Sequence, residues 1–586
     1  MNRKFCWVLP LILMLGGCGG GDSSSEASTA TGATGGTGTG GTGSTGTGGS
    51  SGSGSGGTTT TPVEPAPVLK MGWLLPQSAN DSINVLTVSL FKNDGSVWSG
   101  SIPTLQFTSS CSEQGQAQWL EAPIIDGHQV SQAYLAKGCA GPDRVQVSFN
   151  WQQSTVIQTI SLPLTAAALS AKAQLGQQLF FSKALSASGV QSCATCHQPA
   201  NRYASAVSSS TEVGGSTMQH SGFRNTPSAT YSALIPRFGF LGVTNQQGTV
   251  DNIANGKLGT PRRGQLWDGR AALITTQAAG PLLSPFEMAH TDAASVLRTL
   301  LQLPQATLYR QVYGNLSGTS NAVTVLENVA DAIGTFETED RSFVPFNSKF
   351  DAVTAGTASF TAQEANGQAL FNDGTKGACR GCHDSTGLSV DSPQLFSDLS
   401  YRVLAVPRNF NIVYNNDTTA GSALDKLGVA SLRNGALIAT SQHEFYDLGF
   451  CGPFRTDSLL DPTLCGAFRA APLRNVAVRK SYFHNGIYHQ LADVVRFYIL
   501  RDVQPAQIYK TAQGAADNQY NDLPSEYHAN IVANRNPFTP TPNGNPRLTP
   551  EEVNDLVTFL CTLTDGFDPT APETYRQSPQ CLAAKR

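Results

Sequence analysis

The stretch Cys193-Ala194-Thr195-Cys196-His197 decides the fold, and its pattern returns as Cys379-Arg380-Gly381-Cys382-His383. Two thiols three residues apart can form thioether bonds to the vinyl groups of one haem, and the histidine that follows can ligate the iron. A structural zinc site would need four ligands, and each motif supplies three at most. The two motifs therefore predict two covalently bound haem c groups with His197 and His383 as proximal ligands.

Both motifs lie in a similar sequence context. Gly176-Gln177-Gln178-Leu179-Phe180-Phe181 precedes the first motif. Gly367-Gln368-Ala369-Leu370-Phe371 precedes the second and follows a capping box at 361–364. Apolar residues recur at helical spacing at 325–336 and again after Thr549, which predicts a closing helix in each half. Helix, haem motif and closing helix are the plan of a cytochrome c domain.

The N-terminus reads as an export signal. Arg3 and Lys4 precede an apolar stretch too short to span a membrane, and small residues lead to Cys18. The pattern resembles a bacterial lipoprotein signal, in which Cys18 becomes the lipidated N-terminus. Cleavage by an ordinary signal peptidase is the alternative. Gly19 stands where an aspartate would direct retention in the enterobacterial sorting pattern, so we expect a lipid anchor on the periplasmic side of the outer membrane.

A low-complexity segment and a β-rich segment follow. Residues 19–66 are almost entirely glycine, serine and threonine, which predicts a disordered linker. Short stretches with a period of two follow between 67 and 165 and indicate an immunoglobulin-like β-sandwich. Cys111 and Cys139 are the only cysteines there, so we pair them. The fold class is multidomain, an all-β sandwich followed by two mainly α cytochrome c domains: 1–18 signal, 19–66 linker, 67–165 sandwich, 166–345 and 346–586 cytochrome c domains.

The composition of the chain excludes some classes of function. The chain has 38 basic and 42 acidic side chains, a net charge of −4, so no basic field is present to bind nucleic acid. Apolar runs stay below the roughly 18 residues that a membrane span needs. Of the twelve cysteines, Cys6 lies in the signal and Cys18 is the lipidation site, four lie in the haem motifs and two in the sandwich, so four remain. Local loop closure favours Cys451–Cys465 and Cys561–Cys581, although four cysteines allow three pairings.

The region 166–566 resembles the bacterial di-haem cytochrome c peroxidases and their relative MauG. Besides the haem motifs, the matching stretches are Leu179-Phe180-Phe181, Arg224-Asn225-Thr226-Pro227-Ser228, Leu266-Trp267-Asp268-Gly269-Arg270-Ala271, Pro281-Leu282-Leu283-Ser284-Pro285-Phe286-Glu287-Met288, Leu473-Arg474-Asn475-Val476 and Tyr482-Phe483-His484-Asn485-Gly486. The resemblance implies reduction of hydrogen peroxide at the N-terminal haem, with electrons passed through the C-terminal haem from a small cytochrome c or cupredoxin. The alternative is a MauG-like oxidase that uses a high-valent two-haem state to oxidise a protein substrate.

The resemblance also implies roles around the first haem. Glu287 would take a proton from one peroxide oxygen and return it to the other. Gln277 could hydrogen-bond the iron's water or peroxide, and Pro281 would keep the sixth iron position free of side chains. Trp267, the only tryptophan of the haem region, would carry electrons between the haems. A surface glutamate and a core tryptophan are the structural alternatives, and a bare electron carrier would need no acid–base group.

The second haem decides between the two activities. Tyr498 lies fourteen residues after His484, where peroxidases commonly have a methionine iron ligand and MauG has tyrosine. A thioether favours ferrous iron and raises the potential, whereas a phenolate is a hard anion that lowers it. A buried tyrosine that ligates nothing is the alternative. His484 itself matches a family residue near the second haem, where hydrogen bonding is a more plausible role than ligation.

Two further sites follow from the resemblance. A calcium ion between the domains is implied at Asn225, with the backbone carbonyls of Arg479 and Ser481; two basic side chains, Arg479 and Lys480, weaken this expectation. His220 lies in the loop before Asn225 and is a candidate resting-state ligand of the first haem, although its spacing differs from that of the family.

Overall fold

A computed structural model gives the fold of the parts of the chain that the structure describes: 64–166, 169–241, 253–254, 257–258, 260–315, 321–384, 394–416, 432–433, 436–437, 445–455, 461–575 and 577–585. The predicted signal peptide, the anchor at Cys18 and nearly all of the linker lie outside these residues. No helix of the described chain is long and apolar enough to cross a membrane.

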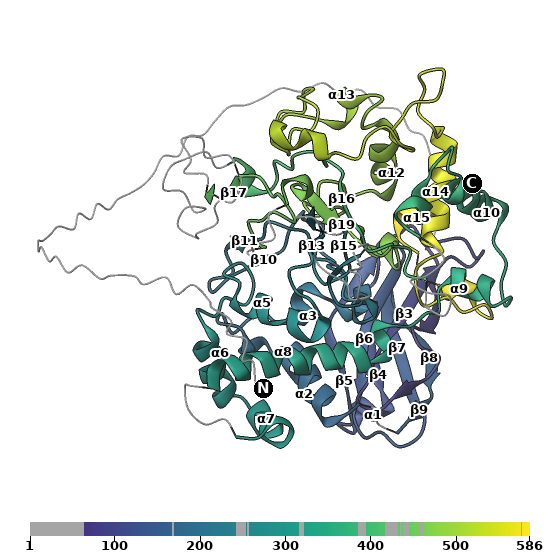
Figure 1. Cartoon of the computed structure of the whole chain (residues 1–586). Coiled ribbons are helices and arrows are strands. Elements are labelled where there is room, and N and C mark those ends of the chain that lie inside the picture. The colour runs from purple at the N-terminus through teal and green to yellow at the C-terminus, as the bar shows by residue number, and fades with distance from the viewer. Residues whose placement is uncertain are drawn as a thin grey trace, which may run out of the picture. The chain divides into compact units, whose positions relative to one another are not determined.

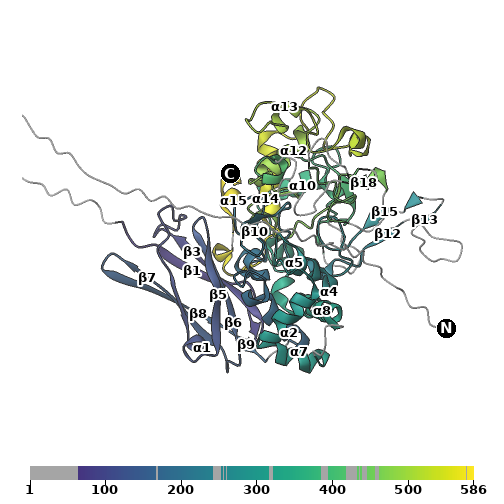
Figure 2. The ribbon, with the colours of Figure 1, turned by 90° about the vertical axis from the view of Figure 1, so that its left-hand side faces the viewer.

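The β-rich segment forms a module of two main antiparallel sheets, which we call the β module (residues 68–165). The first sheet has the order β1 (Val68–Trp73), β3 (Ile83–Phe91), β6 (Gln129–Ala136) and β5 (Ala117–Asp126). The second has the order β4 (Gln106–Ser109), β7 (Asp143–Trp151) and β8 (Ser154–Leu162). A short parallel pair joins β2 (Ser78–Ala79) to β9 (Leu164–Thr165). Figure 2 shows the long strands running beside one another.

The alternation of side chains along the strands builds the core of the β module. Val145, Val147 and Phe149 alternate along β7 and share one buried cluster with Leu86 and Val88 of β3. The two sheets therefore pack face to face, as the period of two predicts. β3 and β6 are buried along their whole length, because their other faces join a second buried cluster that also contains residues of helix α2 (Ala171–Phe180).

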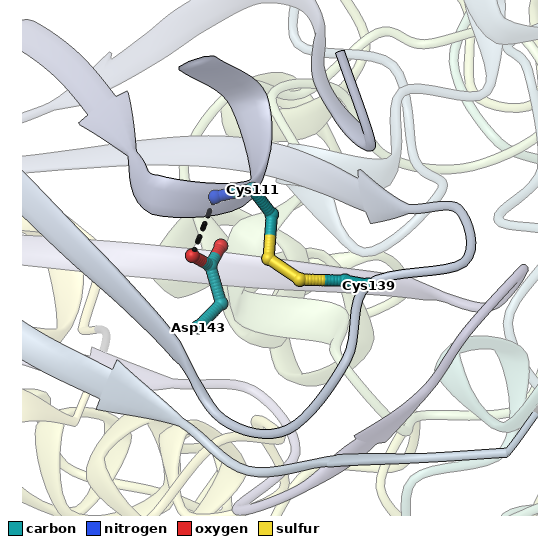
Figure 3. Close-up of side chains that lie close together, drawn as sticks. All are labelled: Cys111, Cys139 and Asp143. Atoms are coloured by element: carbon teal, nitrogen blue, oxygen red, sulfur yellow. Dashed lines mark hydrogen bonds between the residues drawn. A yellow bond between two sulfur atoms is a disulfide. The ribbon is translucent and has the colours of Figure 1, made fainter. Parts of the chain in front are cut away.

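The predicted disulfide of the β module is confirmed. Cys111 lies on α1 (Ser110–Glu113) and is bonded to Cys139 (Figure 3). The fully buried carboxylate of Asp143 accepts hydrogen bonds from the Cys111 backbone N–H at 3.0 Å, from the Ser110 hydroxyl at 2.7 Å and from the Tyr134 hydroxyl. These bonds tie the disulfide loop to β7. Both sulfurs are in the disulfide, so this cluster offers no metal-binding thiolate.

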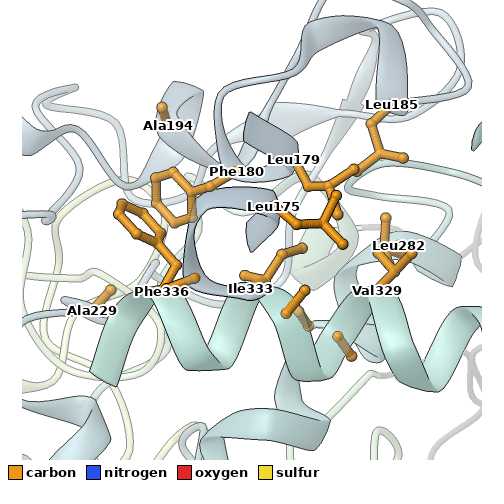
Figure 4. Packing of buried hydrophobic residues seen from close by; sticks show 14 of the residues in the cluster. Leu175, Leu179, Phe180, Leu185, Ala194, Ala229, Leu282, Val329, Ile333 and Phe336 are labelled. Carbon is orange, nitrogen blue, oxygen red and sulfur yellow. The ribbon is translucent and has the colours of Figure 1, made fainter. Parts of the chain in front are cut away.

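In the first half of the haem region, two helices cross at close range (Figures 1 and 4). α2 (Ala171–Phe180) packs on α8 (Ala322–Glu339), and the rings of Phe180 and Phe336 are 5.6 Å apart. A Cβ on Gly176 would lie 1.9 Å from the Ala332 carbonyl oxygen, so only glycine allows this approach. The other helices of this half are α3 (Cys193–Cys196), α4 (Ile274–Gln277), α5 (Ala279–Leu283), α6 (Ala293–Gln302) and α7 (Gln305–Tyr313).

The second half repeats the arrangement. α10 (Ala362–Asn372) crosses α14 (Pro550–Cys561), and a Cβ on Gly367 would lie 2.0 Å from the Asp555 carbonyl oxygen. The predicted capping box Thr361–Glu364 is present, and a second one opens α14. The other helices are α9 (Lys349–Thr354), α12 (Leu491–Leu500), α13 (Pro505–Ile508) and α15 (Pro579–Ala584). The two favoured disulfides, Cys451–Cys465 and Cys561–Cys581, are confirmed.

Short strand pairs complete the fold: β10 (Val213–Gly214) with β11 (His220–Ser221), β12 (Gly239–Leu241) with β15 (Thr260–Arg262), β13 (Ile253–Ala254) with β14 (Lys257–Leu258), β16 (Tyr401–Val403) with β19 (Ala467–Arg469), and β17 (Leu432–Arg433) with β18 (Ala436–Leu437). Among these, the β16–β19 pair borders the site described next. The sequence predicts a mainly helical region here, and these strand pairs were not predicted.

Candidate functional site

The first haem motif opens into a cavity, which we call the first cavity. Cys193, Cys196 and His197 line it, and its empty volume is about 1490 Å³, part of it open to solvent. Both cysteines are outside any disulfide. The Nδ1 of His197 lies 3.3 Å from the Tyr203 carbonyl oxygen, which can only accept, so Nδ1 carries the hydrogen and Nε2 keeps its lone pair. Burial lowers the pKa of His197 to about 4, so the ring is neutral, as iron ligation requires.

The four residues predicted to act at the first haem line this same cavity. Gln277 ends α4, Pro281 lies in α5, Glu287 follows in the loop after α5, and Trp267 faces them from a separate loop. The Glu287 backbone N–H donates to the Ser284 carbonyl at 3.1 Å, and this turn aims the glutamate at the cavity. The structure thus brings together, from residues 193 to 287, the set that the sequence proposed.

Glu287 has the electrostatics of an acid–base group. The Glu287 side chain is exposed, because it lines the open cavity, but the protein around the cavity still desolvates it. Burial raises the pKa of Glu287, and a hydrogen bond from Ser284 and the charge of Arg270 oppose this only in part. A carboxyl group with a raised pKa accepts a proton more readily than an ordinary glutamate and can return it to a leaving group.

The second haem motif opens into a second cavity of about 2100 Å³, lined by Cys379, Cys382 and His383. These cysteines are also outside any disulfide. The Nδ1 of His383 donates to the Phe396 carbonyl at 3.1 Å, and burial lowers the pKa of the ring. The geometry of the first motif is therefore repeated, with Nε2 left as the ligand atom.

Tyr498 lines the second cavity from α12. Its ring packs between those of Phe483 and Phe538, at centroid distances of 6.0 and 5.7 Å. Burial raises the pKa of the phenol, and the neighbouring thiols of Cys382 and Cys379 add to this. Among the described residues, the Tyr498 hydroxyl has no hydrogen-bond partner, which leaves its oxygen available as a ligand.

His484 also lines the second cavity, but its ring is held by stacking. It lies on the ring of Phe468 with centroids 3.6 Å apart, and burial lowers its pKa to about 4. His220 is not among the residues that line the first cavity, and its Nδ1 lies 3.2 Å from the Pro285 carbonyl oxygen. The described structure therefore offers no support for His220 as a ligand of the first haem.

Trp267 lies in a wall that the two cavities share. Both are lined by the same five residues: Pro227, Ser228, Ser232, Trp267 and Arg469. The indole N–H of Trp267 donates to the Asn225 carbonyl at 2.7 Å, and its own carbonyl accepts from the Arg469 backbone N–H at 2.8 Å. The indole is thus fixed from both halves of the haem region.

A buried ion network beside Trp267 was not predicted from the sequence. Arg224 pairs with Asp268 at 2.8 Å and with Asp447 at 2.6 Å, and all three side chains are at least nine-tenths buried. Burial alone would raise the pKa of Asp268, but the charges of Arg224 and Arg270 lower it. Arg224 lines the first cavity and Asp447 lines the second, so this ion network, like Trp267, reaches from one cavity to the other.

Arg469 provides a test of whether a haem fits. It lies on β19, its Nε donates to the Leu266 carbonyl at 3.2 Å, and its buried Nη1 has no hydrogen-bond partner among the described residues. Burial lowers the pKa of this guanidinium. A buried cation with an unpaired hydrogen-bond donor costs free energy unless an anion pairs with it, and a haem carboxylate would be such an anion. Free thiols, available imidazole nitrogens and this donor therefore all fit a haem in each cavity.

Two more carboxyl groups line the first cavity, and neither was predicted from the sequence. Burial raises the pKa of Glu337, on α8, to about 8. Burial also raises the pKa of Glu212, which accepts a hydrogen bond from the Ser205 hydroxyl. No motif marks either residue. The helical periodicity of α8 could have placed Glu337 on a buried face, but it gives no hint of the cavity.

We expect two covalent haems per chain from this geometry. A pyridine haemochrome assay should give two, and His197→Ala and His383→Ala should each abolish one normal iron site. His489→Ala is the control, because His489 is exposed and lines neither cavity. A value of one haem per chain would contradict the assignment of both cavities.

The paired cavities define a di-haem c-type protein, and comparisons with known proteins agree. A family model described as di-haem cytochrome c peroxidase matches residues 170–359. MauG, the methylamine utilization protein of Paracoccus denitrificans, is 30% identical over 427 residues, 69% of this chain and 91% of that protein. The cytochrome c551 peroxidase of Pseudomonas aeruginosa is 27% identical over 323 residues, 55% of this chain and 70% of that protein.

A solved structure is similar as well. The diheme peroxidase BthA from Burkholderia thailandensis is 29% identical, with a TM-score of 0.54, and the match covers 71% of this chain and 94% of that one. The chain belongs to the di-haem cytochrome c peroxidase family, which includes MauG. Its relatives are oxidoreductases that act on peroxide, and membership implies two c-type haems.

Proposed function

We propose that this chain reduces hydrogen peroxide in the first cavity with electrons that enter through the second. The observation that carries the proposal is the common lining of one cavity by the first haem motif, Glu287 and Gln277, with Trp267 in the wall to the other. The haems, when bound, would supply the iron that takes up peroxide and the redox centre that receives electrons. The balance is H₂O₂ with two electrons and two protons giving two waters, and the electron donor is a small cytochrome c or cupredoxin.

Residues of the chain transfer the protons in this proposed reaction. Glu287 accepts a proton from the peroxide oxygen nearer the iron and returns it to the departing oxygen, which leaves as water. Its raised pKa makes the carboxylate a stronger proton acceptor than an ordinary glutamate. Gln277 donates a hydrogen bond to the bound oxygen, and Pro281, which has no donor, keeps the space clear.

A specific observation favours a second activity. Tyr498 presents a hydroxyl without a partner to the second cavity, and none of the described methionines, Met71, Met218 and Met288, lines that cavity. A phenolate ligand would stabilise oxidised iron. In this alternative a protein side chain, as in a MauG-like oxidase, would supply the two electrons instead of a redox protein.

Stopped-flow spectroscopy separates the two activities. If the peroxidase reading holds, fully oxidised protein reacts slowly with peroxide until one electron is supplied, and a reduced cytochrome c or cupredoxin then supports turnover. Prompt reaction without pre-reduction, with a long-lived spectral change and no turnover with these donors, would favour the oxidase. Absence of any reaction in both experiments would contradict both.

Trp267→Phe is expected to leave peroxide uptake intact but to slow electron exchange between the haems. Phenylalanine keeps an apolar ring in the shared wall but loses the easily oxidised indole and its bond to the Asn225 carbonyl. Exchange is measured by flash reduction of one haem. Trp73→Phe is the control, since Trp73 lies in the β module and lines neither cavity. Exchange at the wild-type rate would reduce Trp267 to a packing role.

We further propose the finer organisation that the sequence predicts. The two face-to-face antiparallel sheets support an immunoglobulin-like class for the β module, and the repeated helix crossings support haem domains at 166–345 and 346–586. Three disulfides within the described chain support export to the periplasm. The linker and the lipid anchor at Cys18 would then hold the enzyme at the outer membrane.

A further inference from the structure

The residues expected to hold calcium lie together, but they already bond to one another. The Asn225 side-chain amide donates to the Ser481 carbonyl at 2.9 Å and to the Phe483 carbonyl at 3.2 Å. The Arg479 carbonyl accepts from the Tyr482 hydroxyl at 3.2 Å. Asn225 thus presents the donor end of its amide to oxygens that would have to face an ion.

A guanidinium group lies among the same oxygens. The Nε of Arg479 donates to the Ser481 carbonyl at 3.3 Å, and its Nη2 donates to the Thr226 carbonyl at 2.9 Å. Thr226 belongs to the first half of the haem region and Arg479 to the second. The side chain therefore links the two halves through carbonyl oxygens, which is the link that a calcium ion would make.

Charge argues in the same direction. Calcium takes about six to eight oxygen ligands and prefers carboxylates among them. The neighbouring acidic residue Asp126 is already paired with Lys480 at 2.7 Å. Arg479 has no ion pair among the described residues, and a divalent ion beside it would meet uncompensated repulsion. A guanidinium group stays protonated in proteins, so Arg479 carries its charge at neutral pH.

We propose that the Arg479 guanidinium takes the place of calcium in this chain, which therefore binds no calcium at Asn225. The internal cation fixes the loop at 225–226 against the segment at 479–484. The Asn225 carbonyl accepts the Trp267 indole N–H, so the same link also fixes the tryptophan of the shared wall. This inference concerns the fold and stands whether the chain is a peroxidase or an oxidase.

The first test uses the wild-type haem-loaded protein. After dialysis against a chelator, elemental analysis should find no stoichiometric calcium, and titration with calcium chloride should give no binding heat. The visible spectrum and the Tm should be the same in chelator and in excess calcium. One calcium per chain, with a Tm that falls on its removal, would overturn the proposal.

The second test restores a neutral residue. Arg479→Thr should lower the Tm in chelator, and calcium chloride should recover it while one ion binds per chain. Lys480→Thr is the matched control and should remain indifferent to calcium. A wild-type Tm for Arg479→Thr in chelator would overturn the proposal that Arg479 replaces calcium. Equal calcium binding by Lys480→Thr would overturn it too, because net charge and not Arg479 itself would then control binding.

A third variant covers the case in which Arg479→Thr does not fold. Arg479→Lys keeps the charge but cannot reach two carbonyl oxygens with a planar fork. It should have a lower Tm than wild type and stay indifferent to calcium. A wild-type Tm for Arg479→Lys would show that the bridge between Thr226 and Ser481 contributes nothing and would overturn the proposal.

Discussion

Glu287→Gln is expected to reduce peroxide turnover by about 10²–10⁴-fold, the usual range for loss of a general acid–base group. Glutamine keeps the volume and the hydrogen-bonding capacity of the side chain but cannot accept a proton. Haem content and reduction by dithionite should be unchanged. The measurement is the rate of peroxide consumption with a reduced cytochrome c or cupredoxin as donor, or, for the oxidase, the rate of reaction with peroxide.

Glu212→Gln is the matched control for Glu287→Gln, because it removes another carboxyl group with a raised pKa from the lining of the same cavity. It should change turnover little. The pH profile adds a second check. Only the ionised Glu287 accepts a proton, so activity should fall as the pH drops through its pKa, which burial raises. That acid limb should disappear in Glu287→Gln, and unchanged turnover in this variant would contradict its role.

Tyr498→Met is expected to raise the midpoint potential of the second haem by a sizeable part of the roughly 0.8 V that axial ligands span. A thioether favours ferrous iron, whereas a phenolate favours the ferric state. The variant should therefore behave more like a peroxidase that needs pre-reduction. Spectroelectrochemical titration measures the potential, and the visible spectrum reports the change of ligand.

Tyr488→Met is the matched control for Tyr498→Met. The ring centroids of Tyr488 and Phe497 are 6.1 Å apart, so Tyr488 belongs to the aromatic cluster around Tyr498. Its buried hydroxyl also lacks a hydrogen-bond partner among the described residues, but Tyr488 does not line the second cavity. Its substitution should leave the potential unchanged. A Tyr498→Phe protein with the wild-type spectrum in both oxidation states would show that tyrosine is not the ligand, and the oxidase reading would lose its main support.

The features that were predictable from the sequence are those that a few neighbouring residues determine. A haem motif needs only five consecutive residues. The spacing of the apolar residues and the capping residues indicate the helix before it. The disulfides joining Cys451 to Cys465 and Cys561 to Cys581 close short loops and could be favoured for that reason. Resemblance to a family then placed Glu287 and Trp267, which no periodicity singles out.

The shared wall was not predictable, because its members come from segments far apart in the chain. Arg224 meets Asp447 across 223 residues, and the importance of Arg469 rests on a missing hydrogen-bond partner that only the fold reveals. The path of the Arg479 side chain was not predictable for a similar reason. The family pattern there concerns backbone carbonyls and says nothing of where the side chain of that position goes.

The two glycine crossings bear on how this enzyme can be re-engineered. Gly176 and Gly367 hold the backbones of their helix pairs so close that even an alanine methyl group would collide with a carbonyl oxygen. Both halves therefore share a close helix crossing, and they differ in the segments that line their cavities, which include α4 and α5 in the first half and α12 in the second. A chimera that exchanges those segments between the halves, with both glycines kept, would move the side chains of one site while both helix crossings stay in place.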